Sequence, residues 1–581
     1  MNRKQRRASE RTYPPAAAAA TNQSTAAMFQ SARQASRAGD LKTAADLYQK
    51  ILALDPRHVP ALDGLGGVYF AQGKIAEASA LLAQVPPLAP LVLEQFNKVL
   101  DLLVTLHPSV GEAMQKATAA WPRLLTPEDM FGAGLSAIIS DPYLRTVLAS
   151  TVVRDLGLER VLTAQRAAIL AAAVDDAPVT DAVLGFCSAL AQQCFINEYI
   201  WAVSAEQAAQ LETLRARLAG AMERHEPIAP LWTLVLAMYA ALYELPGAKA
   251  LGERDWPAPA AAVIAQQIRE PREEQALRAS MPRLTPIGDG VTATVRQQYE
   301  ENPYPRWVLL VDAQRQIPVD EYLRHLFPAA PYRVVGEPDQ LDILVAGCGT
   351  GRYALEVAQS YRNAHVLGVD LSLSSLASAK RRTPPRLAGK IEFAQADIFK
   401  LAAIERRFDV INASGVLHHT ADPLGAWREL LKLLKPNGVI QVGLYSAYGR
   451  REVLATRALV AARGYRSTVE DIRRCRQDLL GEPQRFGYMQ WKDFFSTSEC
   501  RDLLFHVHEQ QFTIPEIKAF ITENDLNFIG FEIQPDDMHR QLRQLFIANN
   551  WSLGDLDRWD ALERDNPDMF STMYGFWIQK N

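Results

Sequence analysis

The 581 residues predict a multidomain chain in which an all-α N-terminal region precedes an α/β domain. Three observations support that fold class. A helical pattern recurs after 34 residues near the N-terminus. An Ala- and Leu-rich sequence with helical spacing covers residues 92–285. Predicted strands alternate with helices from residue 341 onward. At about 150 residues per domain, the length corresponds to roughly four domain equivalents.

The composition is that of a folded protein, with 48% hydrophobic residues, 22% charged residues and a net charge of −4. This near-neutral balance gives no sign of nucleic-acid binding. The longest apolar stretch, Ile228 to Tyr243, has 16 uncharged residues, fewer than the roughly 20 that span a bilayer, so it predicts a buried helix and no membrane span.

The N-terminus and the cysteines predict a cytoplasmic location. Met1 to Arg11 is basic but is not followed by the Leu-rich core of a secretory signal. The five cysteines contain no CxxC pair, which argues against a disulfide framework and against a zinc ribbon.

The repeat lies in the first ninety residues. Gly39, Ala44 and Tyr48 recur 34 residues later as Gly73, Ala78 and Leu82. Small residues allow two helices to approach, and bulky ones fill the groove between them. The pattern resembles the tetratricopeptide repeat family, which implies a helical surface that holds a protein or peptide partner.

Composition shifts divide the chain into five segments. We expect a disordered basic and Ala-rich tail at 1–24, repeats at 25–90, an all-helical middle domain at 91–285, a linker or lid at 286–330 and an α/β domain at 331–581. Within the middle domain, Gln193 to Tyr199 mixes polar and aromatic residues, and we interpret it as a buried helix face or, alternatively, a partner-binding face.

The α/β domain begins with a pattern typical of a nucleotide cradle. A predicted strand, Leu341 to Ala346, runs into Gly347-Cys348-Gly349-Thr350-Gly351 and then a helix. Glycines allow the tight turn, and a side chain there would keep a ligand away from the main chain. A second strand ends in Asp370, about 20 residues after the glycines, where a carboxylate can accept from ribose hydroxyls.

Further motifs follow in order. Predicted strands end at Asp397 and Asn412, and the text continues with Gly415-Val-Leu-His-His-Thr420 and Leu434-Lys-Pro-Asn-Gly438. Together these motifs resemble the class I S-adenosylmethionine-dependent methyltransferases, which have a Rossmann-like fold. A nicotinamide-binding domain would share the first strand and its glycines, but not ordinarily the other motifs.

The resemblance implies S-adenosylmethionine as the cofactor and assigns residues to it. The glycine turn would pass under the methionine part, Asp370 would hold the ribose, and Asp397 with Ile398 would border the adenine. The full cofactor set is Gly347, Cys348, Gly349, Thr350, Gly351, Asp370, Leu371, Asp397, Ile398, Asn412, Ala413 and Ser414. The family usually has an acidic residue at the position of Val345, so a contact to the methionine amino group must come from elsewhere.

An activated methyl donor needs an aligned acceptor more than it needs a metal. The candidate catalytic residues are His418, His419 and Tyr299, and the two histidines could instead only shape the pocket wall. The candidate substrate-binding residues are Tyr304, Arg306, Tyr445, His506 and His508. No metal is expected, because Glu509 is the only further ligand near His506 and His508.

Two segments flank the predicted chemistry. The aromatic and Pro-rich text from Gln298 to Trp307 predicts a lid over cofactor and acceptor, or alternatively a packed linker. Residues 446–511 form an insertion after the fifth strand, on the substrate side of such folds. Its many arginines are diluted by acidic residues, so we expect a solvated helical face.

These observations favour a methyltransferase that acts on an unidentified acceptor and uses its repeats to recruit a protein partner or substrate. Two alternatives remain. The acceptor could be a small molecule, with the repeats serving only assembly, or the chain could be a scaffold that binds cofactor without chemistry.

Overall fold

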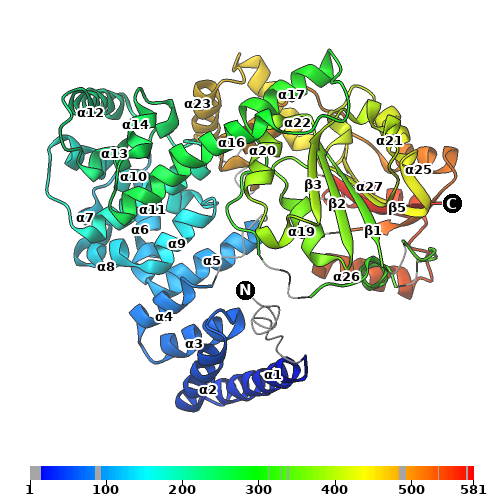
Figure 1. Cartoon of the computed structure of the whole chain (residues 1–581), viewed down its shortest axis with the longest axis horizontal. Coiled ribbons are helices and arrows are strands. Elements are labelled where there is room, and N and C mark those ends of the chain that lie inside the picture. Colours follow the sequence, from blue (N-terminus) through cyan, green and yellow to red (C-terminus); the bar gives the residue numbers. More distant parts are fainter. Residues whose placement is uncertain are drawn as a thin grey trace, which may run out of the picture. The chain divides into compact units, whose positions relative to one another are not determined.

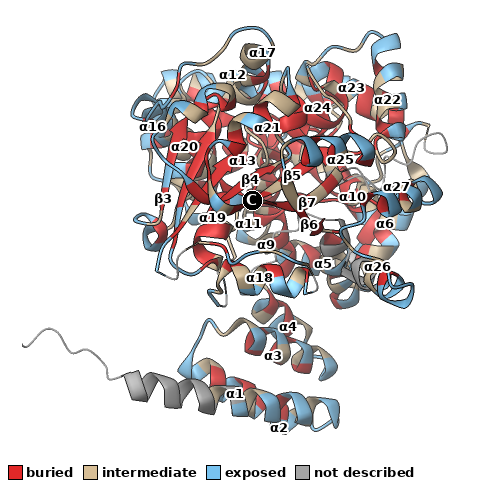
Figure 2. Cartoon of the chain, turned by 90° about the vertical axis from the view of Figure 1, so that its right-hand side faces the viewer, coloured by how far each residue is buried: buried red, intermediate tan, exposed pale blue. Residues whose placement is uncertain are grey.

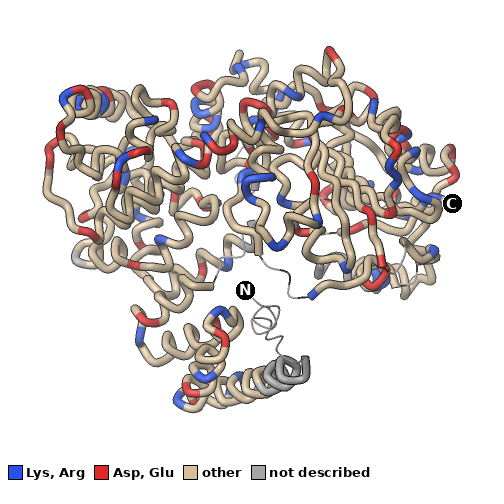
Figure 3. The backbone as a smooth tube through the Cα atoms, in the orientation of Figure 1, with Lys and Arg blue, Asp and Glu red and all other residues tan. Residues whose placement is uncertain are grey.

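A computed structural model describes residues 15–581, except 86–92, 312, 314, 329, 337–338, 483–491, 534–535 and 571–572. The chain divides into two compact units, Met1–Leu190 and Ala191–Asn581. This division falls inside the predicted middle domain 91–285. Figure 3 shows basic and acidic residues interspersed along both units.

The first unit is all-helical, as predicted. Its helices are α1 Pro15–Arg37, α2 Leu41–Leu54, α3 Val59–Ala71, α4 Ile75–Leu82, α5 Leu93–Leu106, α6 Pro108–Ala120, α7 Pro127–Phe131, α8 Leu135–Ser140, α9 Pro142–Ser150 and α10 Leu156–Val174. Helix α1 begins inside the segment predicted as a tail, and residues 1–14 lie outside the described part of the chain.

The repeat positions take the places that the pattern predicts. Ala44 and Ala78 are fully buried at the helix contacts, and Tyr48 is 3% exposed. A Cβ on Gly66 would lie 2.8 Å from the Leu82 side chain. Small residues on one helix therefore receive the bulky residues of the next, which explains the spacing of the repeat.

The second unit starts with α11 Asp181–Ile196, which crosses the division, and continues helically. Its next helices are α12 Ala205–Glu223, α13 Pro230–Leu236, α14 Ala248–Glu253, α15 Ala258–Ile264 and α16 Glu270–Ala279. The long apolar stretch from Ile228 is mostly buried, as predicted, but helix α13 covers only seven of its residues. No helix among the described residues is long and apolar enough to cross a membrane. All five cysteines are buried, and none of them forms a disulfide.

A seven-stranded sheet organises the rest of the unit, with the order β3-β2-β1-β4-β5-β7-β6 (Figure 1). Strand β7 is antiparallel to its neighbours β5 and β6, and the other strand pairs are parallel. The strands are β1 Leu341–Ala346, β2 Ala364–Asp370, β3 Ile391–Gln395, β4 Phe408–Ser414, β5 Leu434–Tyr445, β6 Leu526–Phe531 and β7 Met573–Lys580.

Hydrophobic cores cover both faces of this sheet, and Figure 2 shows its strands almost wholly buried. One core packs α18 Val319–Leu326, α19 Arg352–Ser360 and α20 Leu373–Arg381 on the sheet. The other packs α21 Pro423–Leu431, α25 Ile514–Glu523 and α27 Leu556–Asp565. Residues alternate between the cores from Ile343 to Ala346 of β1, which is why this part of the strand is apolar throughout.

The remaining elements carry the site. The predicted lid contains helix α17 Val291–Glu301, and the short turn η6 Leu417–His419 follows β4. The insertion consists of α22 Arg451–Ala462, α23 Val469–Leu480, η8 Lys492–Phe494 and α24 Thr497–Phe505. Helices α26 Asp536–Ala548 and α27 lie between β6 and β7, where the sequence analysis predicts no helix.

Candidate active site

The turn between β1 and α19 requires glycine at three positions. Gly347, Gly349 and Gly351 have φ of +68°, +52° and +81°, values that other residues rarely adopt. A Cβ on Gly347 would lie 2.5 Å from the Val416 side chain, and one on Gly349 would lie 2.3 Å from the Tyr304 carbonyl oxygen. The main chain of the predicted lid itself thus occupies the space that a side chain at Gly349 would need.

The lid is hydrogen-bonded to this turn. The Thr350 N–H donates to the Tyr304 carbonyl at 3.2 Å, and the Thr350 hydroxyl donates to the Pro305 carbonyl at 2.5 Å. The Trp307 indole N–H donates to the Thr350 carbonyl at 3.1 Å. These bonds fix the aromatic and Pro-rich segment directly over the glycines.

Asp370, at the end of β2, faces the same turn. Its carboxylate accepts from the Gly349 N–H at 2.8 Å and from the Ser372 N–H at 2.9 Å. Burial raises the pKa of Asp370 to about 6, although both backbone hydrogen bonds oppose the shift. The Cys348 thiol beside it is also buried, which raises its pKa and keeps it protonated.

Asp397, after β3, is held by the segment that precedes the lid. It is 3% exposed, and its carboxylate accepts from the Gly288 N–H at 3.0 Å. Its own N–H donates to the Thr285 hydroxyl at 2.8 Å. Ile398 is buried next to it, and the Leu371 carbonyl accepts from a Gln395 amide at 2.8 Å.

The end of β4 belongs to a polar network. Asn412 donates to Gln441 at 2.7 Å, and the Tyr353 hydroxyl donates to the same Gln441 oxygen at 2.7 Å. The Ser414 N–H lies 3.4 Å from the Asn412 side-chain oxygen, and Ala413 is fully buried. The predicted cofactor residues therefore gather at the carboxyl ends of β1, β2, β3 and β4.

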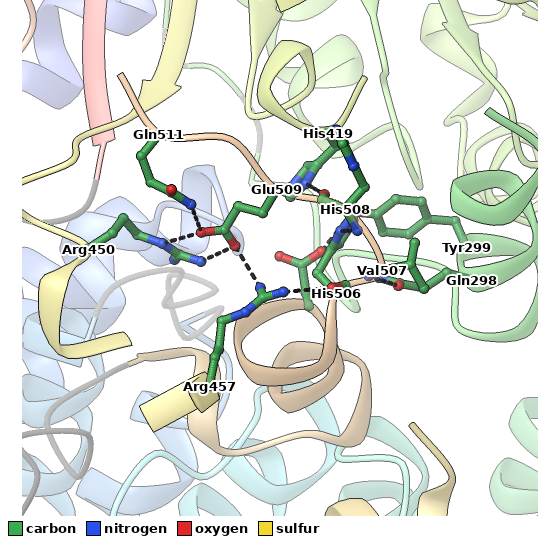
Figure 4. Close-up of polar contacts among 11 residues, drawn as sticks. Gln298, Tyr299, His419, Arg450, Arg457, His506, Val507, His508, Glu509 and Gln511 are labelled. Atoms are coloured by element: carbon green, nitrogen blue, oxygen red, sulfur yellow. Dashed lines mark hydrogen bonds and ion pairs between the residues drawn. The ribbon is translucent and has the colours of Figure 1, made fainter. Parts of the chain in front are cut away.

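A second group converges at the carboxyl ends of β4 and β5, where Figure 4 shows Tyr299 from α17, His419 from η6 and His506 after α24. The Tyr299 hydroxyl donates to Asp502 at 2.7 Å and lies 3.2 Å from His506 Nε2. The rings of His419 and His506 stack with centroids 3.7 Å apart. Three segments far apart in the sequence thus meet in one buried cluster.

Backbone contacts fix the tautomers of two histidines. His506 Nδ1 accepts the His508 N–H at 3.1 Å, so the neutral His506 ring carries its hydrogen on Nε2. His419 Nδ1 lies 2.9 Å from the His508 carbonyl oxygen and must donate to it. Burial lowers the pKa of both rings, which favours the neutral forms. His419 Nε2 therefore carries no hydrogen, and its lone pair can accept a proton.

The same cluster has the composition of a metal site, which the sequence analysis does not predict. One ligand atom from each of His419, Asp502 and His506 lies within 4.8 Å of the others. A metal on His506 Nε2 would need the hydrogen that this tautomer carries, because Nδ1 already accepts an N–H. Burial also raises the pKa of Asp502, so that it holds a proton more readily than usual. The hydrogen-bonding pattern therefore favours proton transfer over metal binding.

Tyr445 and His418 lie beside this cluster. The two rings stack with centroids 3.7 Å apart, and the Arg450 guanidinium lies 3.8 Å from the Tyr445 centroid. Arg450 also pairs with Glu509 at 2.5 Å, with both side chains 2% exposed. His418 is fully buried, and neither of its ring nitrogens has a hydrogen-bond partner among the described residues.

The prediction of a solvated arginine face in the insertion is wrong for two residues. Arg450 is 2% exposed, and Arg476 is 1% exposed and donates to the Phe494 carbonyl at 2.7 Å. By contrast, the side chains of Arg466 and Arg474 are 80% and 63% exposed. Acidic residues among the arginines indicate that ion pairs can form, but they do not indicate whether a given arginine is buried.

The segment Gln193 to Tyr199 supports the site from the helical part of the unit. The Glu198 carboxylate accepts from the Ser498 N–H at 2.6 Å and pairs with Arg306 of the lid at 3.2 Å. Its carbonyl accepts from the Thr497 hydroxyl at 2.8 Å. Glu198 and Tyr199 both have positive φ, 54° and 59°. Glu198 therefore ties the lid to the start of α24.

The sequence marked the segment that contains Glu198 without giving Glu198 a role at the site, and it gave no role to Asp502, Thr285 and Gly288. Asp502 had a signal, because it precedes His506 by four residues and one helical turn places such residues on the same face. The other three act through long-range backbone contacts, for which the local pattern holds no signal.

Comparisons with known proteins address both parts of the chain. A model of a methyltransferase domain matches residues 344–442, and a model of the tetratricopeptide repeat matches residues 35–99. The first match covers β1 to most of β5, and the second covers the helices in which the period of 34 was found.

Several curated proteins are similar over part of their length. An uncharacterised protein of Synechococcus sp. is 29% identical over 42% of this chain and 60% of its own length. Phosphoethanolamine N-methyltransferase 1 of Triticum aestivum is 32% identical over 21% of this chain and 24% of its own length. The ubiquinone biosynthesis O-methyltransferase of Leptothrix cholodnii is 33% identical over 18% of this chain and 45% of its own length. The chain thus spans between a quarter and three fifths of these relatives.

Among solved structures, PKMT2 from Rickettsia typhi in complex with AdoHcy aligns with a TM-score of 0.36 and 17% identity, over 44% of this chain and 52% of that one. The magnesium protoporphyrin IX methyltransferase from Synechocystis aligns with a TM-score of 0.28 and 13% identity, over 51% of this chain and the whole of that one.

Proposed function

Because the chain carries a class I S-adenosylmethionine-dependent methyltransferase domain behind N-terminal tetratricopeptide repeats, we propose that it methylates an acceptor bound at the ends of β4 and β5. We further propose that His419 takes the acceptor's proton. The observation that supports this role best is the His419 tautomer, because a backbone carbonyl holds the hydrogen on Nδ1 and leaves Nε2 as a base.

The residues at the ends of β1 to β4 fit the cofactor. The glycine turn presents backbone N–H groups, and the Asp370 carboxylate lies against that turn, where it can accept from ribose hydroxyls. Asp397 and Ile398 would border the adenine, and Asn412 to Ser414 would lie nearest the acceptor. When bound, S-adenosylmethionine supplies an activated methyl group, so the protein has chiefly to position the acceptor and exclude water.

The acceptor-side residues then have separate roles. His419 Nε2 removes the proton, and the imidazolium that forms lowers the pKa of the nearby Asp502, whose ionised carboxylate then stabilises it. Tyr299 holds Asp502 and His506 in place through its hydroxyl. Tyr304, whose hydroxyl lies 3.5 Å from Asp493, covers the acceptor from the lid side.

Other predicted substrate residues have structural partners that limit what they can do. Arg306 is paired with Glu198, and the Tyr445 ring is stacked on His418 and contacted by Arg450. The backbone of His508 orients two histidine rings. Its N–H donates to His506 Nδ1, and its carbonyl accepts from His419 Nδ1. We therefore assign contact with the acceptor to Tyr304 and the Tyr445 hydroxyl before the others.

The test of the proton acceptor compares two adjacent histidines. The full chain is incubated with S-adenosylmethionine and a cell extract, and S-adenosylhomocysteine is measured for the wild type, His419→Gln and His418→Gln. We expect His419→Gln to lower turnover by about 10²–10⁴-fold with cofactor affinity unchanged. The adjacent buried His418 is the matched control, because it has no oriented ring nitrogen.

Three results would contradict these assignments. Full turnover in His419→Gln would remove the proposed base. Cofactor binding without S-adenosylhomocysteine production by the wild type would mean a non-catalytic scaffold. Binding of NADH in preference to S-adenosylmethionine would remove the methyltransferase proposal itself.

For the repeats, we propose that they recruit a protein or peptide acceptor, because stacked helix pairs present an extended binding surface. A leucine at Gly66 would collide with Leu82, whereas Gly67 has no neighbour within 4 Å and is a matched control. We expect Gly66→Leu to raise the KM for the acceptor while kcat and cofactor affinity stay constant, and Gly67→Leu to change neither. An unchanged KM in Gly66→Leu would mean that the repeats serve only assembly.

A further inference from the structure

A second cavity lies beside the lid, within the second unit. Its volume is about 440 Å³, which is in the range of small-molecule sites. Pro303 and Pro305 line it, whereas the Tyr304 hydroxyl between them reaches Asp493 instead. The cavity therefore lies on the face of the lid away from Tyr304. Helices α16 and α20 supply much of the remaining wall.

Arginines dominate the chemistry of this wall, and most of them are neutralised by carboxylates. Three are paired within 3.2 Å: Arg278 with Glu300, Arg306 with Glu198, and Arg381 with both Glu270 and Glu274. Such pairs leave little net charge to attract a ligand.

Arg382 is different. Its guanidinium lies 5.1 Å from the Trp307 ring centroid, and its Nε lies 3.4 Å from the Ser378 hydroxyl. No described residue forms an ion pair with it, and the charges near it are the cations Arg381 and Arg306 and the carboxylates Glu270 and Glu274, which already pair with Arg381. Burial and the Arg381 charge lower the pKa of Arg382 to about 10, so the charged form is disfavoured in this wall.

A second group in the same wall also lacks a partner. The side-chain oxygen of Gln266 is buried and has no hydrogen-bond partner among the described residues. Buried polar atoms in folded proteins are normally satisfied, and each exception needs an explanation. A guanidinium without a carboxylate partner and an acceptor without a hydrogen bond in one cavity together match a ligand that carries both an anionic group and a hydroxyl.

We propose that this cavity binds a small hydroxylated anion, a carboxylate or a phosphate ester, with Arg382 as its principal donor. A guanidinium can donate two parallel hydrogen bonds to either group, and stacking on Trp307 fixes its plane. The Gln266 oxygen would accept from the ligand's hydroxyl. The cavity borders the cofactor turn, because Thr350 lines it together with Trp307, but the proposal does not depend on the methyl acceptor.

Binding there has a consequence for the cofactor. Trp307 lines the cavity and donates to Thr350 of the glycine turn, and Arg306 lines it while paired with Glu198. A ligand that neutralises Arg382 therefore stabilises the residues that hold the lid on the turn. It should strengthen S-adenosylmethionine binding, and by linkage the cofactor should strengthen ligand binding equally.

The test is calorimetric titration of the full chain with citrate, with glucose 6-phosphate and with inorganic phosphate. Citrate and the sugar phosphate separate the carboxylate from the phosphate source, and inorganic phosphate lacks the carbon-borne hydroxyl. We expect saturable binding of citrate or glucose 6-phosphate that Arg382→Gln weakens by about tenfold or more, the loss expected for a charge-assisted hydrogen bond. Arg406→Gln, an exposed arginine paired with Glu392 outside the cavity, should bind as the wild type does.

Controls separate this proposal from folding and from the methyltransferase reaction. Thermal melting and S-adenosylmethionine titration show whether Arg382→Gln is folded, and neither needs an acceptor. No binding of any of the three probes at millimolar concentration would overturn the proposal. Equal binding by the wild type and Arg382→Gln would also overturn it, because the anion would then be bound elsewhere. An unchanged cofactor affinity with ligand present would overturn the linkage to the lid.

Discussion

Asp370 is a buried carboxyl group whose titration should be visible in cofactor binding. Burial raises its pKa from 3.8 to about 6, the nearby Glu300 charge adds to the shift, and the Gly349 and Ser372 N–H groups oppose it. The carboxyl therefore becomes protonated as pH falls through about 6, and it then loses acceptor capacity for the ribose hydroxyls. We expect S-adenosylmethionine affinity to fall over this pH range and to be weak and pH-independent in Asp370→Asn.

The same shift has the opposite effect on stability. An acid whose pKa is raised on folding disfavours its ionised form in the folded state, so stability decreases as pH rises from about 3.8 through about 6. Asp370→Asn should therefore melt at a higher temperature than the wild type at neutral pH, while it binds cofactor less tightly. A wild-type affinity that stays constant between about pH 5 and pH 7 would contradict this account.

Single residues differ in how far the sequence predicts them. Asp370 and Asp397 could be placed because each follows an apolar strand, and the ends of parallel strands meet at one edge of a sheet. The Tyr299–Asp502 hydrogen bond joins residues 203 apart in the chain. No local pattern contains such a contact, because it depends on where the insertion folds back.

At the scale of elements, the lid and the glycine turn should behave as one structure. A Cβ on Gly349 would lie 2.3 Å from the Tyr304 carbonyl, whereas Gly415 has a comparable φ of +77° and nothing within 4 Å. Both alanine variants carry the backbone strain of about 1–2 kcal/mol, but only Gly349→Ala displaces the lid. We expect Gly349→Ala to weaken cofactor binding by more than tenfold and Gly415→Ala to leave it nearly unchanged, as measured by calorimetry.

Helix α24 should depend on Glu198 in a similar way. Glu198 accepts the Ser498 N–H and pairs with Arg306, so Glu198→Gln weakens both contacts and leaves the partly buried Arg306 charge without its partner. We expect a loss of about 2–4 kcal/mol in unfolding free energy and a lower kcat, because α24 carries Asp502. Glu301→Gln, whose carboxylate is 47% exposed and paired with Arg501, should cost no more than about 1 kcal/mol.

The measurement is denaturant unfolding together with turnover at saturating cofactor. A kcat that falls in Glu198→Gln while cofactor affinity is retained would agree with a positioning role. Equal losses in Glu198→Gln and Glu301→Gln would contradict it.

Elements with a strong period were predictable and irregular ones were not. The strands from β1 to β4 appear as apolar runs because helices cover both faces of the sheet. Strand β5 begins at Leu434, before the apolar run from Val439, because Leu434 already pairs with Phe408; a register shift that contains Asn437 at φ +60° separates this pair from Val439. Helices α26 and α27 have no counterpart among the elements expected from the sequence.

At the scale of the whole molecule, composition predicts several domains with a boundary near residue 285, and the chain divides into two compact units at Leu190 and Ala191, inside the expected middle segment. The Pro-rich text at 257–286 was a reasonable boundary signal, since such text usually lies in linkers. Here it lies inside a folded unit, where Met281 is buried in a sheet core and the Leu284 N–H donates to the Gln395 carbonyl at 2.9 Å. Long-range packing, which composition does not report, decides where a unit ends.

This division predicts two transitions in calorimetric unfolding of the full chain. The cofactor residues all belong to the second unit, so S-adenosylmethionine at about 100 times its Kd should stabilise that unit by about 2.7 kcal/mol and raise one transition by a few degrees. Gly66→Leu, which disturbs the repeat packing in the first unit, should lower only the other transition. A single transition that responds to both changes would mean that the two units unfold together, and the lid, the sheet and the repeats would then form one cooperative structure.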